Sequence, residues 1–430
     1  QYRSLKLVYS WFGGLLCRMV RRGRPPKVER EFSVPDLIGF GFLTAFFPAS
    51  LVDKVLADAG RLERRVRLLP SRVVVYYVLA MALYAGEGYR ELFRLLVEGL
   101  RSFDPSLPVV IPQKSAFSRA RERVGSEPLK SLFAEVAAPI ATEDTPGAFY
   151  RSWRLLSVDG STLEVPDTVE NAERFGRPGV SRGERSAYPR VRWVALAEVG
   201  TRAIIGMEAG AYRESEHTLV EPLLDKLASG TLCLADRGFF GFEAYQRATA
   251  AGGDLLWRLK KNLVLPVVER LSDGSYLSLI YPNPNARRDG SHPGVSVRVI
   301  EYELTDPGLP EREDKYRLIT SVLNADAAPA EELAALYTQR WEVELSIREI
   351  KVTQGRPGLV LRSRKPDGVI QELYGFMCVH YAIRWLLHQA AAQAVVDPDR
   401  LSFTSGMRAM KRKLSRPESF SPHGPRNPDS

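Results

Sequence analysis

The sequence predicts an α/β fold that follows a helical domain, and three observations support this prediction. Residues 32–150 have the apolar spacing of helices, whereas short apolar runs typical of strands dominate after Pro146. Two of these runs are largely apolar, as buried strands usually are, and they lead into Asp159 and Asp236. A long amphipathic helix is expected to begin near Pro329.

The first third of the chain is expected to hold a basic segment followed by helices. Residues 1–31 are basic and rich in Gly and Pro, so we treat them as a separate segment. Apolar spacing predicts helices over residues 36–47, from 50 onward, and over 71–84, 91–100 and 114–123. We therefore place a helical domain at residues 32–150.

Strands and helices alternate in the next part of the chain. We expect strands at 155–158, 191–199 and 203–207, with a turn centred on Gly200 joining the last two. Further segments follow in the order helix 215–227, strand 231–235, helix 242–251, strand 255–259, a strand-rich insertion at about 260–325, and helices 329–353 and 368–396. This is the order of the ribonuclease-H-like α/β fold, which we place at residues 151–400. A basic, mobile tail is expected at 401–430.

Composition and charge limit the possible functions. A chain of 430 residues with 45% apolar residues is expected to form two or three packed domains. The net charge of +9 predicts a polyanionic partner, which is nucleic acid or an acidic membrane face. No apolar stretch reaches the ~18 residues of a membrane span, so we expect no membrane partner. The scattered cysteines fit no disulfide or zinc pattern, which favours a cytoplasmic location.

Two aspartates stand where α/β sheets place ligands. Asp159 and Asp236 follow predicted buried strands, and side chains at that end of a strand emerge from the core into a crevice. The alternative is that each aspartate only begins a turn, as the pair Asp159-Gly160 commonly does. Taken alone, either aspartate is better explained by a turn.

The predicted helix at 329–353 supplies a third carboxylate with cations around it. At about 100° per residue from Tyr337, one stripe of the helix holds Arg340, Glu344 and Lys351, with Arg348 nearby. Glu342 and Glu349 point away from this stripe, and an apolar stripe beside it would pack on the sheet. The alternative is a solvated face with ion pairs between residues four apart. That alternative does not explain why the cations gather around one carboxylate.

Together these groups fit the cleavage or transfer of a phosphodiester. Two Mg²⁺ ions about 4 Å apart can activate the nucleophile and stabilise the leaving oxygen, and both prefer carboxylate oxygens. Asp159, Asp236 and Glu344 would hold the metal ions. The stripe would bind DNA phosphates, Arg by a bidentate contact, Lys as a point charge and the tyrosine hydroxyl as a donor.

At these residues the sequence resembles the DDE transposases of the insertion-sequence-four family. The family signature of Tyr, two residues, Arg, three residues, Glu, six residues and Lys matches Tyr337, Arg340, Glu344 and Lys351. The first aspartate lies in a similar hydrophobic-Asp-Gly-Ser element, and the second begins an Asp-Arg-Gly-Phe element that includes Arg237. The helical domain is similar to the N-terminal domain of many members, so we expect it to bind DNA.

The resemblance implies a transposase with a catalytic triad of Asp159, Asp236 and Glu344. It implies cleavage at the transposon ends that depends on two Mg²⁺ ions, with Mn²⁺ as a possible substitute, and then strand transfer into target DNA. The expected partners are double-stranded DNA, at the terminal inverted repeats and the target, and a second copy in a homodimer on paired ends. A nucleoid-associated location follows. The alternatives are a catalytically inactive DNA-binding protein derived from a transposase and a ribonuclease-H-like nuclease.

Other segments leave two interpretations open. Arg22 and Arg24 resemble a hook that enters the minor groove of A·T-rich DNA, although a solvated basic linker explains them as well. Relatives that excise through a hairpin hold a flipped base on an aromatic side chain of the insertion region. Trp257 and Tyr276 are both positionally possible for this role, neither is matched to it, and core packing is the alternative for Trp257. The arginines of residues 119–123 fit either a DNA-reading helix or an amphipathic surface helix.

Overall fold

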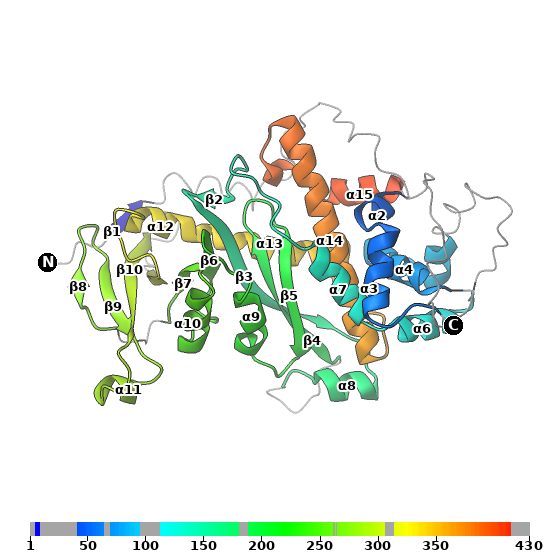
Figure 1. Cartoon of the computed structure of the whole chain (residues 1–430), viewed down its shortest axis with the longest axis horizontal. Coiled ribbons are helices and arrows are strands. Elements are labelled where there is room, and N and C mark those ends of the chain that lie inside the picture. Colours follow the sequence, from blue (N-terminus) through cyan, green and yellow to red (C-terminus); the bar gives the residue numbers. More distant parts are fainter. Residues whose placement is uncertain are drawn as a thin grey trace. The chain divides into compact units, whose positions relative to one another are not determined.

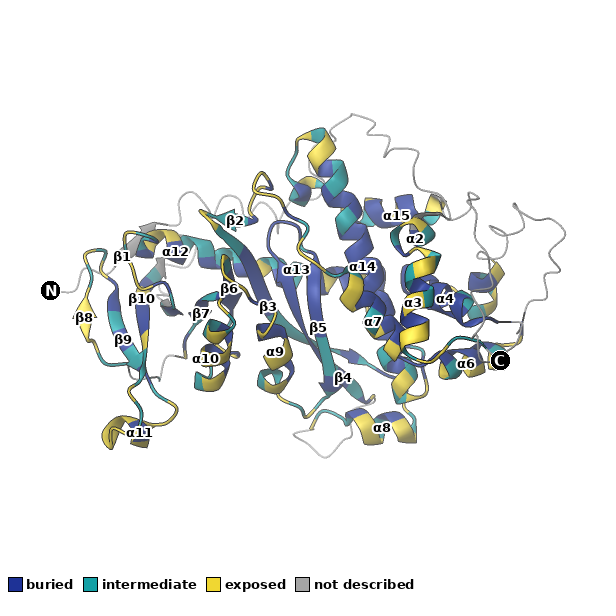
Figure 2. Ribbon diagram, viewed as in Figure 1, coloured by how far each residue is buried: buried dark blue, intermediate teal, exposed yellow. Residues whose placement is uncertain are grey.

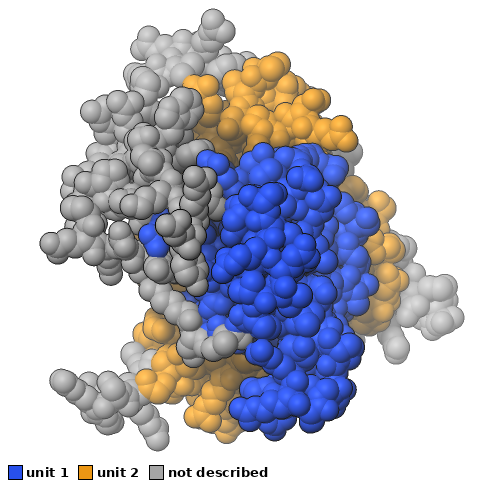
Figure 3. Space-filling view, turned by 90° about the vertical axis from the view of Figure 1, so that its left-hand side faces the viewer, with its two compact units in different colours: residues 1–32, 149–159, 216–341 blue, residues 33–148, 160–215, 342–430 orange. Residues whose placement is uncertain are grey.

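The computed structural model describes residues 5–8, 41–63, 69–94, 112–179, 188–260, 263, 265–305 and 314–413. The chain divides into two compact units, which Figure 3 draws in different colours. Unit 1 comprises residues 1–32, 149–159 and 216–341, and unit 2 comprises residues 33–148, 160–215 and 342–430. The chain passes from one unit to the other inside strand β3 (Trp153–Glu164) and again after the first residue of helix α13 (Trp341–Arg348).

Unit 1 contains a mixed sheet with the strand order β3-β6-β7-β11-β10-β9-β8. Strands β3, β6 and β7 are parallel, and the remaining neighbours are antiparallel. Two further strands lie outside this order, β2 pairing with β3 and β1 pairing with β10. The bounds are β1 (Leu5–Val8), β2 (Phe149–Tyr150), β6 (Thr231–Ala235), β7 (Asp254–Arg258), β8 (Glu269–Arg270), β9 (Tyr276–Ile280), β10 (Val295–Thr305) and β11 (Asp314–Thr320).

Helices accompany the parallel strands of unit 1 (Figure 1). Tyr245 of α10 contacts Trp257 of β7 edge to face, with ring centroids 5.8 Å apart, and both side chains are buried. Burial of such large aromatic side chains is a main source of packing energy. The helices of this unit are α9 (Glu216–Leu224), α10 (Phe242–Ala250), α11 (Pro284–Arg288), α12 (Ala330–Leu336) and the 3-10 helix η1 (Tyr337–Arg340).

Unit 2 is centred on two buried helices, α4 (Ser71–Leu83) and α14 (Pro366–Ala394), both largely dark in Figure 2. A Cβ atom at Gly375 of α14 would lie 2.9 Å from a methyl carbon of Val78 in α4, so a glycine is needed for this close approach. The other helices of the unit are α2 (Gly41–Phe46), α3 (Ala49–Asp58), α6 (Lys114–Val124), α7 (Glu127–Val136), α8 (Val169–Phe175), η2 (Glu349–Gln354), η3 (Pro398–Arg400) and α15 (Phe403–Lys413).

The predicted hairpin of unit 2 is confirmed as β4 (Arg190–Glu198) and β5 (Ile204–Ala211). Gly200 in its turn has φ 82°, and a Cβ atom there would lie 2.7 Å from the backbone nitrogen of Ala148. Any other residue would therefore be strained and would collide with the segment that precedes β2.

The order of elements along the chain confirms the predicted ribonuclease-H-like succession. Strands β3, β4 and β5 precede α9, β6, α10 and β7, and the insertion forms β8 to β11 with the short helix α11. Residues 403–413, placed in the predicted tail, form α15 with Met410 fully buried. The predicted domain boundaries stay predictions. None of the described helices could cross a membrane.

The segment 329–353 was predicted to be one continuous α-helix, and this prediction was wrong. The segment is α-helical in α12, 3-10 helical in η1, α-helical again in α13 and π-helical in η2. Because a 3-10 turn has about 3.0 residues, Tyr337 and Arg340 lie on the same side of η1, closer in angle than a uniform α-helix would place them.

Candidate active site

The sheet of unit 1 brings the two candidate aspartates together. Strands β3 and β6 are parallel neighbours, and Val158 is in register with Ala235. Asp159 and Asp236 directly follow these two residues in the sequence. Adjacent strands lie about 4.8 Å apart, and in-register residues share a face. The two aspartates therefore lie next to each other where the pairing of β3 with β6 ends.

The environment of the two aspartates differs in detail from the prediction. β3 was expected to end at Val158, but it continues to Glu164, so Asp159 lies inside the strand. The pairing with β6 ends at Val158, and the later part of β3 has a bridge from Glu164 to Val360 in unit 2. Asp236 lies after the end of β6, where its backbone oxygen accepts a hydrogen bond from the Phe239 nitrogen at 3.0 Å.

Asp236 has the features of a metal ligand. Its Oδ1 atom is buried and has no hydrogen-bond partner within the described part of the chain. A buried carboxylate oxygen without a partner is costly, and a divalent cation satisfies it well. This oxygen atom therefore has the chemistry of a metal ligand. Among the described residues, no three His, Cys, Asp or Glu side chains are grouped closely enough to form a complete metal site.

Two hydrogen bonds join η1 to the strands that carry the aspartates. The Tyr337 hydroxyl donates to the backbone oxygen of Ala235 at 3.2 Å, and the Ser157 hydroxyl donates to the backbone oxygen of Arg340 at 3.3 Å. Burial raises the pKa of Tyr337 well above its usual value, so the hydroxyl keeps its proton. Because that one proton is used in the bond to Ala235, the predicted phosphate contact of Tyr337 would require this bond to break.

The other signature residues, Glu344 and Lys351, belong to unit 2. Glu344 is half-buried on α13. The Lys351 ammonium donates to the Ser161 hydroxyl at 3.0 Å, and Ser161 follows Asp159 by two residues in β3. Burial, with repulsion from Arg190, lowers the pKa of Lys351, while Glu164 opposes this shift.

Glu342 is bound on a different side of the same helix, as the predicted angles require. The Arg202 side chain, in the turn between β4 and β5, donates to both carboxylate oxygens of Glu342 at 2.6 and 3.2 Å. The same guanidinium lies 3.0 Å from Asp399, and the Arg202 backbone oxygen accepts a hydrogen bond from Ser346 at 3.1 Å. Arg202 has φ 59°, a left-handed conformation that is uncommon for a residue with a side chain.

Glu349 is buried by α14. Arg384 forms a bidentate pair with its carboxylate, and His380 lies 3.1 Å from it. Burial opposes ionisation of Glu349, but Arg384, His380 and Arg202 together hold its pKa below the usual value. We call Arg202, Glu342, Glu349, Arg384 and Asp399 the buried charge cluster. Sequence reasoning missed it, because its members come from distant segments and only the glutamates lie in a recognised motif.

Of the remaining predicted positions, Arg237 and Arg348 are exposed, Arg340 is 9% exposed, and Arg22 and Arg24 lie outside the described residues. Trp257 is 1% exposed and Tyr276 is 7% exposed. Their burial agrees with core packing. Arg121 is buried and bonded to Gln371 and Ser363, which assigns this part of α6 to helix packing.

Comparisons with known proteins match both parts of the chain. The family described as "Insertion element 4 transposase N-terminal" matches residues 37–134, and that described as "Transposase DDE domain" matches residues 152–381. The chain is 30% identical over 383 residues to the transposase InsG for insertion sequence element IS4 of Escherichia coli, covering 88% of this chain and 83% of that protein. A piggyBac transposase synaptic complex with hairpin DNA aligns with 87% of this chain and 79% of that chain, at 13% identity and a TM-score of 0.45.

Proposed function

The chain belongs to the insertion element 4 family of DDE transposases, and on that premise we propose that Asp159, Asp236 and Glu344 are its catalytic carboxylates. The protein is a transposase, an enzyme that acts on DNA and depends on a divalent metal, with a ribonuclease-H-like core.

The observation that carries this assignment is that Asp159 and Asp236 directly follow Val158 and Ala235, the last register pair of β3 and β6. The Oδ1 atom of Asp236, buried and without a partner among the described residues, adds a ligand atom whose burial is explained if a cation binds there. For Glu344 the support is the chain itself. Arg340 is bonded to β3 through its backbone oxygen, and Glu344 follows it by about one helical turn.

We assign two Mg²⁺ ions to these carboxylates, with Mn²⁺ as a possible substitute. Bound there, the ions would supply Lewis acidity for the attacking and leaving oxygens of an in-line displacement. In the first reaction water attacks the phosphorus at the transposon end and the P–O3′ bond breaks, which leaves a 5′-phosphate and a free 3′-hydroxyl. That hydroxyl then attacks a target phosphodiester and displaces a target 3′ oxygen, so no bond between protein and DNA is formed.

The cations of the signature helix would bind and orient the DNA phosphates. Lys351 is suited to this role because its ammonium is half-buried and bonded to a hydroxyl, with no carboxylate within bonding distance among the contacts described. Arg340 and Arg348 would act from the same helix, and Arg237 from the turn after β6. Tyr337 would add a phosphate contact only after releasing Ala235.

The proposed DNA partners are the terminal inverted repeats of the element and a target duplex. A homodimer would hold the two ends together, and the protein would work at the nucleoid. The helical residues 32–150 would contribute DNA contacts, which agrees with their match to the N-terminal family over residues 37–134.

Cleavage assays on single substitutions test the assignment. A plasmid that carries the element with its own ends is incubated with protein and Mg²⁺, and nicked and excised products are measured. Asp159→Asn, Asp236→Asn and Glu344→Gln are each expected to abolish cleavage while DNA binding is retained. The matched control is Glu331→Gln, because Glu331 is an exposed carboxylate in the first turn of α12.

Full cleavage by any of the three variants would remove that residue from the proposed triad. A strand-transfer assay with a pre-cleaved end separates the transposase from a nuclease that only cuts. Joining of the 3′-hydroxyl to target DNA by the wild-type protein is expected, and its absence from a protein that cleaves would contradict the second reaction.

A further inference from the structure

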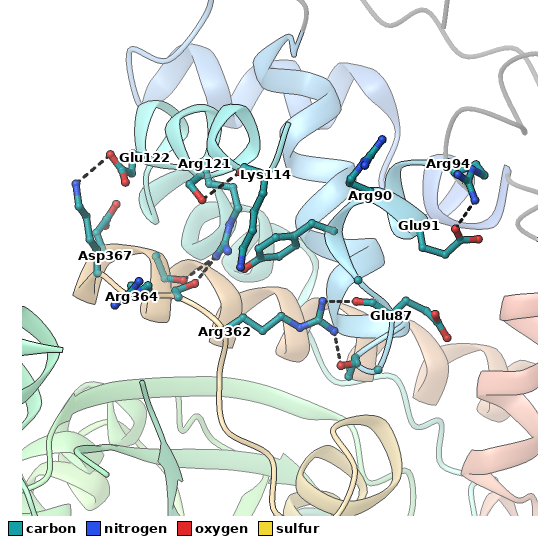
Figure 4. Close-up of a pocket in the computed structure, with 18 residues that line it drawn as sticks. Glu87, Arg90, Glu91, Arg94, Lys114, Arg121, Glu122, Arg362, Arg364 and Asp367 are labelled. Carbon is teal, nitrogen blue, oxygen red and sulfur yellow. Dashed lines mark hydrogen bonds and ion pairs between the residues drawn. The ribbon is translucent and has the colours of Figure 1, made fainter. Parts of the chain in front are cut away.

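Unit 2 contains a basic pocket of about 1280 Å³ whose role the catalytic assignment does not explain. Three segments line it, namely residues 85–94, helix α6 and residues 362–368, which lead into α14 (Figure 4). Seven Lys and Arg side chains and four carboxylates stand along its walls, so its lining has a net positive charge. We call it the basic pocket.

Two of the arginines hold the walls together. Arg362 donates to the backbone oxygens of Glu87, at 2.7 Å, and of Tyr84, at 3.2 Å, and it also bonds to Ala85. Arg121 is buried and bonded to the Ser363 hydroxyl at 2.7 Å and to the backbone oxygen of Gly368 at 2.9 Å. Because these guanidinium groups are already bonded, the pocket is formed before any ligand arrives.

Three other cations of the pocket do not join its walls as Arg121 and Arg362 do. Arg90, Lys114 and Arg364 are exposed, and among the described residues none of them has a carboxylate partner. By contrast, Lys365 pairs with Glu122 at 3.1 Å and Arg94 pairs with Glu91 at 2.7 Å. Each of the three comes from a different one of the lining segments (Figure 4).

The chemistry of the lining selects phosphate over nucleobases. The one aromatic side chain among the described lining residues is Tyr89. Its ring already has the Lys114 ammonium 5.9 Å and the Arg362 guanidinium 5.8 Å from its centroid. Single-strand binding sites use open aromatic faces on which bases stack, and such a face is not offered here. Lys and Arg without partners are the usual contacts of the DNA backbone.

We propose that the basic pocket binds the phosphate backbone of duplex DNA without reading its sequence, through Arg90, Lys114 and Arg364. The inference rests on the proposed function only in that the partner is DNA. Such a contact would hold flanking or target DNA, whose sequence varies, and would leave the choice of the terminal repeats to other residues.

The test compares two triple variants that lose the same charge. One carries Arg90→Ala, Lys114→Ala and Arg364→Ala, and the control carries Arg174→Ala, Arg213→Ala and Lys226→Ala, three exposed cations outside both the pocket and residues 32–150. Thermal melting first verifies that both are folded. Binding to two duplexes of unrelated sequence is measured over a range of salt concentrations with a chelator present, so no cleavage occurs and the result does not depend on the triad.

The pocket variant is expected to bind both duplexes at least about tenfold more weakly than the control. The slope of log K against log salt should become shallower by roughly 0.9 for each phosphate that the variant no longer neutralises. Affinity and slope equal to those of the control would overturn the proposal. Weaker binding to only one of the two sequences, or to single-stranded DNA alone, would also overturn it. A third contradicting result would be a wild-type protein whose melting temperature rises with inorganic phosphate, beside a pocket variant that shows no such rise and binds DNA with unchanged affinity.

Discussion

At the scale of single residues, Asp236 shows how the fold prepares a site that stability alone would not select. Four buried apolar residues of β6 lead directly into it, and the strand ends where its side chain begins. One carboxylate oxygen is thereby buried without a partner among the described residues. An isolated buried acceptor reduces stability, so its presence is explained by a ligand.

Asp236→Asn is therefore expected to separate stability from function. In chelator, the variant should be more stable than the wild type by about 1 kcal/mol, because a neutral amide is less costly to bury than a carboxylate. Added Mn²⁺ should raise the melting temperature of the wild type and leave that of the variant unchanged, since only the wild type binds it at this position. Equal stabilisation of both proteins by Mn²⁺ would contradict the role of Asp236.

Asp399 gives a prediction for pH. Burial, with repulsion from Glu342, raises the pKa of Asp399 to about 7 despite the attraction of Arg202. At pH values between the pKa of Asp399 in the unfolded chain and its pKa in the folded protein, the folded state holds a proton that the unfolded state has released. The free energy of unfolding therefore falls as the pH rises through this range. Above the folded pKa the whole penalty is present.

Asp399→Asn should remove that pH dependence. Relative to the variant, the wild type is expected to lose about 1.4 kcal/mol of unfolding free energy per pH unit within this window. Urea unfolding of both proteins at pH 5, 6 and 8 measures the difference. A constant difference between the two proteins from pH 5 to pH 8 would show that Asp399 has an ordinary pKa.

At the scale of elements, the strands were predictable and the winding of the signature helix was not. The apolar runs before Asp159 and Asp236 identify β3 and β6, because a strand buried on both faces has few polar residues. The winding changes from α to 3-10, back to α and then to π, and the 3-10 and π stretches carry the contacts of Tyr337 with Ala235 and of Glu349 with Arg384. These partners are far away in sequence, so periodicity within the helix does not reveal them.

The buried charge cluster fixes how α13 and η2 are rotated. Arg202 holds Glu342 and Arg384 holds Glu349, on a side of the helix that the angles place away from Glu344. Groups that orient a metal ligand without touching the metal commonly change its affinity by 10–100-fold. Arg202 is thus expected to be a positioning residue for Glu344.

Arg202→Gln tests this role. The Mn²⁺ concentration that gives half-maximal cleavage should rise by roughly tenfold or more, with a weaker calorimetric affinity for Mn²⁺. Adding Glu342→Gln should cause little further loss if the two residues act as a pair. Arg213→Gln, an exposed arginine after β5, is the control. An unchanged Mn²⁺ affinity in a folded Arg202→Gln protein would assign Arg202 a purely structural role.

At the scale of the whole molecule, both compact units are assembled from three separate stretches of the chain. Linear reading of the sequence placed the helical region before the strands, which is correct from α2 onward but omits β1 at the start of the chain. It could not show that residues 33–148 belong to the same unit as 342–430, because that grouping rests on contacts such as Gln371 of α14 with Arg121 of α6. Neither residue carries a motif.

The proposed homodimer makes a prediction about mixed assemblies. If each subunit cleaves one end of a pair, a Glu344→Gln subunit inactivates only its own end. In an equal mixture with wild-type protein, cleavage at single ends should fall to about a half, whereas products cut at both ends should fall to about a quarter, because both subunits of a symmetric pair must be active. In the control, wild-type and variant proteins are each bound to DNA separately and mixed only afterwards, so that subunits do not exchange between dimers. If products cut at both ends fell only to about three quarters, one active subunit would be processing both ends, and the arrangement of one active site for each end would be wrong.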